Sequence, residues 1–198
     1  KTEAEFKIWA GKKNACDATG MNDFYGIQQL CLMSWLMSGD VFVAIKRRKP
    51  TALNPYSLRL HVIEADRIRT PGESTGITIP NFTTGKAENG NLIYDGVEVD
   101  KDGMAVAYHI ANTYPDELVD LSKQTEFARI EAYGEKTGLP NLLHIMSSER
   151  PDQYRGVPYL SQVVKPMLQI RRYTEAEIMA AVIQSFFTAW VKTESPGD

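Results

Sequence analysis

The sequence has little cysteine, no strong excess of one charge and no long apolar run. Cys16 and Cys31 are the only cysteines among 198 residues, so a disulfide framework is excluded. We expect two free thiols in a reducing compartment, serving as small buried apolar residues. The formal net charge is −3, which argues against a protein-wide basic surface for nucleic acid or membrane. No segment reaches the ~20 apolar residues that a membrane span needs.

Recognisable catalytic and metal-binding patterns are also missing. His61, His109 and His144 lie far apart and form no pair with zinc-ligand spacing, so we expect ordinary hydrogen-bonded histidines. Neither a phosphate-binding glycine loop nor a nucleophile elbow appears. Glu64 and Asp66 would share a face if both lie on a strand. A polar strand edge explains them most simply, and an acid–base pair is the alternative.

One weaker pattern is similar to that of metal-dependent nucleases. It combines Asp116 with Glu131 or Glu135 and with Lys136. Glu135 and Lys136 are adjacent, however, and adjacent residues of a strand point to opposite faces of the sheet. A shared metal and lysine site is therefore disfavoured.

What is present favours an ordinary globular fold. Apolar residues make up 43% of the chain and charged residues 24%, with seven Phe, nine Tyr and three Trp. This length suits one large domain or a modest pair, with a core large enough to need no covalent staples. The chain begins at Lys1 without Met and ends shortly after a helical pattern, so we expect a piece of a larger protein.

Helical patterns occur at both ends of the chain. Residues 1–15 predict a short helix or an extended arm. The next helix is predicted to begin after Asn22 or Asp23, which can cap it, and to stop at Gly39. A long helix is predicted from about Gln162 to Val191, because apolar residues recur there every three or four positions. Pro166 fits its first turn.

The middle of the chain has sequence patterns typical of β-strands. Residues 41–45 and 58–63 predict a hairpin, and the basic run Lys46–Lys49 between them is typical of a solvated strand end, with a phosphate-contacting loop as the alternative. Asp102-Gly103 predicts a second hairpin that joins 96–100 to 105–110. Shorter strands are expected at 76–79, 91–94, 127–133 and 142–146. Prolines and glycines make most of 70–96 a long loop or arm.

The densest constellation of polar residues is a turn at 150–160, directly before the long helix. Its candidate assembly or structural residues are Arg150, Gln153, Arg155, Gly156 and Pro158. Arginine forks bind carboxylates or phosphates through two hydrogen bonds. An internally satisfied hinge is the simplest interpretation, and an intersubunit polar contact or a ligand site are the alternatives.

The residues of this turn also carry a resemblance. Arg150-Pro151-x-Gln153-x-Arg155-Gly156-Val157-Pro158 resembles the signature of lambda-type bacteriophage portal proteins. Further segments agree in the same order along nearly all of the chain: Cys16-Asp17, Gly20, Phe24, Gln28, Gly39 to Phe42, Leu58 to Leu60, Glu64 to Arg67, Gly96 to Asp100, Gly103, Tyr108-His109, Leu143-His144, Glu175 to Glu177 and Ala180-Ala181. The family's chains are longer, so this sequence resembles their central portion.

The resemblance implies a structural protein and not an enzyme, with no cofactor or metal. It implies a homo-oligomeric ring, dodecameric in the family, at one capsid vertex, through which DNA is packaged and ejected without sequence-specific binding. The expected partners are other copies of the chain, the terminase large subunit, and head-completion and tail proteins. The location would be the virion, with assembly in the bacterial cytoplasm and no membrane. Another phage head assembly or adaptor module is the alternative, and a metal-dependent nuclease a weaker one.

The resemblance also implies a fold class and a division of the chain. We expect an α+β, portal-like, elongated fold of helices and antiparallel strands with a long C-terminal helix. Residues 1–66 would form a wing-like α/β part, and 67–148 a strand-rich wing or clip part with the long loop. Residues 149–198 would hold the arginine turn and a stem-like helix.

Overall fold

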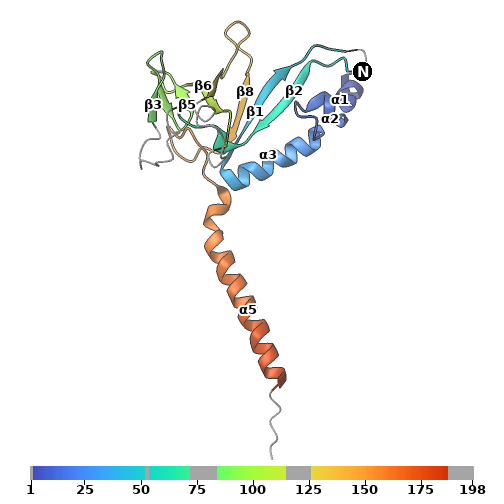
Figure 1. The fold of residues 1–198 in the computed structure, drawn as a ribbon, viewed down its shortest axis with the longest axis vertical. Helices are drawn as coiled ribbons and strands as arrows, with labels where there is room; N and C mark the ends of the chain where they lie inside the picture. Colours follow the sequence, from blue (N-terminus) through green and yellow to red (C-terminus); the bar gives the residue numbers. More distant parts are fainter. Residues whose placement is uncertain (1, 52–53, 72–83, 115–125, 187–198) are drawn as a thin grey trace, which may run out of the picture. The chain divides into compact units, whose positions relative to one another are not determined.

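The computed structural model describes residues 2–51, 54–71, 84–114 and 126–186 (Figure 1). The chain forms two compact units, Lys1–Tyr159 and Leu160–Asp198. The helical elements of the first unit are α1 (Thr2–Gly11), α2 (Lys13–Cys16), α3 (Phe24–Ser38) and the 3-10 turn η1 (Ala65–Arg67). Its strands are β1 (Asp40–Arg47), β2 (Leu58–Ile63), β3 (Thr84–Lys86), β4 (Leu92–Tyr94), β5 (Val97–Val99), β6 (Ala105–Ala111), β7 (Phe127–Glu131) and β8 (Leu142–Met146).

The strands of the first unit form two antiparallel sheets. One has the order β2-β1-β8, and the other has the order β3-β4-β5-β6-β7. In the smaller sheet, Phe42 of β1 pairs with Ile63 on one side and with His144 on the other. Strand β8 therefore returns from late in the chain to lie beside β1 (Figure 1). Helices and antiparallel strands together confirm the α+β class.

Helix α3 begins and ends where the sequence predicts. The Asp23 carboxylate accepts a hydrogen bond from the Gly26 N–H at 2.7 Å and so satisfies one free donor of the first turn. Gly39 ends the helix in the left-handed conformation, with φ of 89°, which glycine adopts without a Cβ clash. The helix contacts β1, the strand that follows it directly.

Two buried clusters hold the first unit together. The larger contains Phe42, Ile63, Val97, Tyr108 and other apolar side chains contributed by both sheets. The smaller lies under α1, α2 and α3. In it, Trp9 donates its indole N–H to the Leu58 carbonyl at 3.0 Å, which ties α1 to the start of β2. Burial of this apolar surface is the main force that joins the helices to the sheet.

Most of the sequence predictions for the first unit are confirmed. Both hairpins form, β1 with β2 and β5 with β6, and the short strands at 91–94, 127–133 and 142–146 are present as β4, β7 and β8. The prediction at 76–79 lies outside the described residues, and β3 was not foreseen. A strand pair of Glu64 and Asp66 is wrong, because β2 ends at Ile63 and Asp66 lies in η1.

The second unit contains the end of the 3-10 turn η2 (Tyr159–Gln162) and helix α5 (Val164–Phe186). The helix confirms the predicted pattern with Pro166 in its first turn, and the predicted extension to Val191 lies outside the described residues. None of its 23 residues is buried. The helices described here lack a stretch long and apolar enough to cross a membrane.

Candidate functional site

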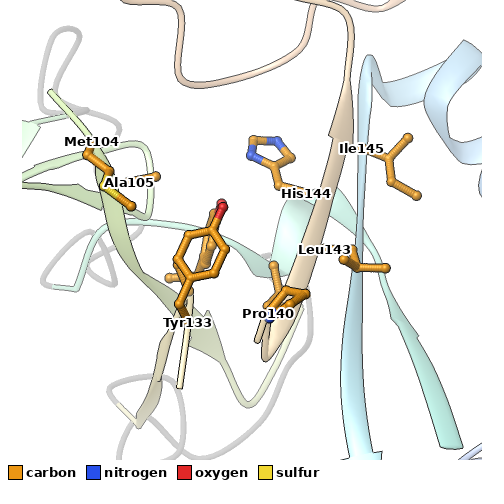
Figure 2. Close-up of a pocket in the computed structure, with 10 residues that line it drawn as sticks. Met104, Ala105, Tyr133, Pro140, Leu143, His144 and Ile145 are labelled. Atoms are coloured by element: carbon orange, nitrogen blue, oxygen red, sulfur yellow. The ribbon is translucent and has the colours of Figure 1, made fainter. Parts of the chain in front are cut away.

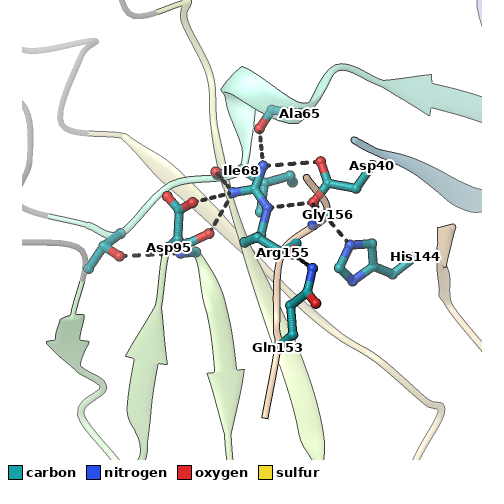
Figure 3. Close-up of polar contacts among 10 residues, drawn as sticks. Asp40, Ala65, Ile68, Asp95, His144, Gln153, Arg155 and Gly156 are labelled. Carbon is teal, nitrogen blue, oxygen red and sulfur yellow. Dashed lines mark hydrogen bonds and ion pairs between the residues drawn. The ribbon is translucent and has the colours of Figure 1, made fainter. Parts of the chain in front are cut away.

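The arginine turn is built around one side chain, Arg155, whose guanidinium is bonded on every side (Figure 3). Its Nε donates to Asp40 Oδ2 at 2.7 Å, and Nη2 donates to Asp40 Oδ1 at 3.3 Å and to the Ala65 carbonyl at 3.1 Å. Nη1 donates to the carbonyls of Ile68 and Asp95, each at 2.8 Å. All five N–H donors of the guanidinium are thereby used. One side chain cross-links β1, the segment after β2 and the β4–β5 turn.

Asp40 is the anionic centre of this network, and its side chain is only 1% exposed. It also accepts the Gly156 N–H at 3.0 Å and lies 3.3 Å from His144 Nε2. Burial alone raises the pKa of this carboxyl. The hydrogen bonds from His144, Arg155 and Gly156, with the charge of Arg155, outweigh that effect and lower the pKa to about 2. Asp40 is therefore a permanent carboxylate at neutral pH.

The turn itself is shaped by Gln153 and Gly156. Gln153 Oε1 accepts the backbone N–H groups of Glu149 and Arg150, and its Nε2 donates to the Arg155 carbonyl at 2.9 Å. Gly156 packs directly on Gly39, so a Cβ at Gly156 would overlap the Gly39 carbonyl. The C-terminal end of α3 and the turn are thus in backbone contact.

The structure brings most of the sequence-predicted residues together. Gln153, Arg155 and Gly156 act in one network, and the half-buried Pro158 follows, with its backbone nitrogen also against Gly39. Arg150 differs, because it is exposed and contributes its backbone to the turn. The role of these residues in assembly stays a prediction.

A second polar network in the five-stranded sheet was not anticipated. Glu98 is fully buried and accepts hydrogen bonds from Asn89, Asn91 and, through both of its oxygens, Arg129. His109 Nε2 lies 3.1 Å from it. The hydrogen bond from Arg129 is the strongest influence on Glu98 and, helped by those from the Asn and His side chains, lowers its pKa to about 2 against the effect of burial. The only sequence signal was an acid between two strand valines.

The two carboxylate networks explain two of the three histidines. His144 is bonded to Asp40 and His109 to Glu98, which confirms the expectation of ordinary hydrogen-bonded histidines at those positions. Burial is the main influence on His109 and lowers its pKa, although Glu98 opposes the shift. His61 is half-buried, and burial and nearby cations lower its pKa as well.

A pocket of about 430 Å³ lies beside His144, between β8 and the β6–β7 pair (Figure 2). Its walls include Tyr108, Tyr133, Pro140 and Leu142. Burial, and to a smaller extent Tyr133, raise the pKa of Tyr108 to about 12, so this phenol stays protonated at neutral pH. The polar groups that line the pocket do not include a nucleophile paired with a base.

The two cysteines and the nuclease-like pattern are the other groups with possible reactivity. Both cysteines are free thiols, and burial raises their pKa, which favours the protonated and unreactive form. Asp116 of the nuclease-like pattern lies outside the described residues. Within the described parts of the chain, no three His, Cys, Asp or Glu side chains come together as a metal site would need.

Comparison with known proteins identifies a matching family and a related protein. The family model for phage portal proteins of the lambda family matches residues 1–198. A probable portal protein of Halomonas phage phiHAP-1 is 27% identical over 201 residues, which cover 99% of this chain and 35% of the relative. The chain thus spans about a third of the length of that curated relative. Since the family model matches its whole length, the chain belongs to the lambda family of phage portal proteins.

Proposed function

We propose that the full-length protein forms a homo-oligomeric ring at one vertex of the phage capsid, through which DNA is packaged and ejected. The family match over residues 1–198 is the observation that carries this proposal. The ring would dock the terminase large subunit during packaging and head-completion and tail proteins afterwards. The protein would be a structural part of the virion, assembled in the host cytoplasm, and the terminase would supply ATP hydrolysis.

The surface of a single copy supports an assembled state. Along α5, ten large apolar side chains are exposed, among them Ile170, Tyr173, Ile178 and Phe186. Helix α3 has no charged residue and exposes Leu32, Met33 and Met37 among others. Extensive exposed apolar surface marks interaction sites in soluble proteins, and contacts between copies in a ring would cover it.

The three-part division of the chain belongs to the same proposal. Residues 1–66 and 67–148 would contribute to the wing and clip, and residues 149–198 would contribute the turn and a stem helix beside the channel. Within the first unit, the arginine network would fix the backbone that leads from β8 towards residue 160. Its proposed role is to keep the first unit rigid, because Arg155 donates hydrogen bonds to three segments that are far apart in sequence.

Electron microscopy of the intact protein tests the proposal. We expect ring-shaped particles with a central passage and a mass several times that of one chain. A full-length protein that stays monomeric at high concentration would overturn it. A terminase pull-down with the intact protein separates a portal from another head adaptor module, since only the portal is expected to retain the terminase.

A further inference from the structure

The tip of the β1–β2 hairpin carries basic residues without acidic ones. Residues 41–63 contain Lys46, Arg47, Arg48, Lys49 and Arg59 and no acidic residue, although the whole chain has a net charge of −3. Arg59 is buried and donates to the Asp17 carbonyl. The other four side chains are exposed. The average charge of the chain therefore hides a local basic surface.

These four cations form no salt bridge with another described residue. The ion pairs formed among residues 2–51, 54–71, 84–114 and 126–186 involve other side chains. Arg47 lies opposite Leu58 at the end of the ladder, and the Arg48 N–H continues it to the Ser57 carbonyl at 2.8 Å. Because successive residues of an extended strand point to opposite faces, the run presents cations on both sides of the ribbon.

Two further lysines extend this surface. Asn54, in the segment between β1 and β2, donates its side-chain N–H to the Asn14 carbonyl at 3.1 Å. This bond holds the hairpin connection against α2, where Lys12 and Lys13 immediately precede Asn14 and are exposed. The basic tip is thus defined by six side chains from two segments of the chain, Lys12, Lys13, Lys46, Arg47, Arg48 and Lys49.

We propose that the basic tip is a sequence-independent contact for the phosphate backbone of duplex DNA. A uniformly positive surface suits a polymer with one negative charge about every 1.7 Å of its axis. Protein interfaces centre instead on aromatic or aliphatic anchors, and the only large apolar side chain exposed in the described part of the hairpin is Leu58. The inference goes beyond the ring proposal, because it concerns the surface of one copy.

The expected binding is weak and dependent on salt. Each neutralised phosphate contributes about −0.9 to the slope of log affinity against log salt concentration. Four to six contacts therefore predict a slope of about −4 to −5. At physiological salt, the expected Kd is that of non-specific binding, about 10⁻⁴ to 10⁻⁶ M. Such a contact would guide DNA without arresting it.

Fluorescence anisotropy with a labelled 20-base-pair duplex tests the proposal on the 198-residue chain between 50 and 200 mM NaCl. The variant Arg47→Gln/Arg48→Gln should bind at least about tenfold more weakly at 50 mM, with a slope about 2 units shallower. The matched control Lys101→Gln/Lys136→Gln removes two exposed lysines elsewhere in the first unit and should bind as the parent does. Far-UV circular dichroism checks that both variants fold.

A second variant, Lys12→Gln/Lys13→Gln, changes residues outside the β1–β2 hairpin and should also weaken binding to the duplex. The proposal is overturned if the parent chain does not bind the duplex, or if the basic-tip variants and the control lose affinity equally. It is also overturned if polyglutamate of matched charge competes better than unlabelled duplex, since the basic tip would then be a surface for acidic protein. None of these results bears on whether the intact protein forms rings.

Discussion

Arg155 and Asp40 show how a single buried ion pair can organise distant parts of a chain. They are separated by 115 positions, yet the guanidinium joins the first residue of β1 to the turn after β8. The same guanidinium lies over the Phe42 ring, 5.3 Å from its centroid. A buried pair is not by itself a strong source of stability, but removal of one partner leaves an uncompensated charge.

Replacement of Arg155 by Ala should therefore be severe. Arg155→Ala leaves the buried Asp40 carboxylate without its cationic partner and the Ala65, Ile68 and Asp95 carbonyls without this donor. We therefore expect a loss of about 3 to 5 kcal/mol in the free energy of unfolding. Urea denaturation measures it. Arg150→Ala is the control and should change stability by less than about 0.5 kcal/mol, since that side chain is exposed. Equal stability of the two variants would contradict the role given to Arg155.

The buried carboxylates predict a loss of stability in acid. The folded pKa of Glu98 and of Asp40 is about 2, below the ordinary values of 4.5 and 3.8. Their contribution is thus fully present above about pH 5 and is lost as pH falls towards 2. It amounts to roughly 2 to 3 kcal/mol for each group. The lowered pKa of His109 acts in the same direction from about pH 6.5 downwards.

Glu98→Gln tests this linkage. The variant should be less stable at pH 7, because an amide has one acceptor oxygen for the donors that Glu98 now serves, and its stability should fall less steeply between pH 5 and 2.5. Urea midpoints across that range measure both effects. Glu131→Gln is the control, because its side chain is 57% exposed and lies 3.7 Å from Arg129. A Glu98→Gln curve parallel to that of the parent would show that Glu98 does not carry the acid sensitivity.

At the scale of elements, α3 illustrates how local sequence sets the ends of a helix while tertiary contacts set its position. Its cap and its glycine stop act within the helix. Its C-terminal end is then fixed by the contact of Gly39 with Gly156, which no local pattern encodes. The helix has no charged residue and exposes several large apolar side chains, so the face left exposed in one copy is available for contacts with others.

The cap gives a prediction at this scale. Asp23→Ala removes the acceptor of the Gly26 N–H and should reduce the free energy of unfolding by about 1 kcal/mol. Thermal or urea unfolding measures this change. Asp23→Asn keeps an acceptor oxygen and should cost only a few tenths of that amount. If both substitutions are equally neutral, the hydrogen bond does not stabilise the helix.

For the whole molecule, the exposed helix α5 makes a prediction about assembly. Met167, Ile170, Ile178 and Val182 recur at helical spacing and form one apolar stripe. In a ring, copies are expected to bury such a stripe, so Ile178→Glu in the full-length protein should abolish or strongly reduce ring formation. Size-exclusion chromatography with light scattering measures the assembled fraction.

The matched control for that experiment is Gln184→Glu. It adds the same charge to the same helix at an exposed position on a different face and should leave ring formation unchanged. If both variants assemble like the parent, the apolar stripe does not contribute to the interface. If both fail, the effect comes from the added charge and not from the stripe.

The sequence by itself determined the local elements and the family. Caps, stop glycines, Asp-Gly turns and apolar periodicity are short-range signals, and they correctly predicted α3, both hairpins and α5. The ordered matches, with the motif around Arg155 and Gly156 as the densest of them, pointed to the family that the comparison then showed. These properties are readable because each depends on residues a few positions apart.

Only the tertiary structure decided which distant residues meet. The pairing of β8 with β1, the Asp40–Arg155 pair and the four residues bonded to the Glu98 oxygens join positions up to 115 apart. Many strand orders satisfy the same alternation, and the observed order joins both sheets in one buried apolar cluster while it gives the buried carboxylates of Asp40 and Glu98 cationic partners. The strand order depends on contacts between distant parts of the chain, so a local sequence pattern does not predict it.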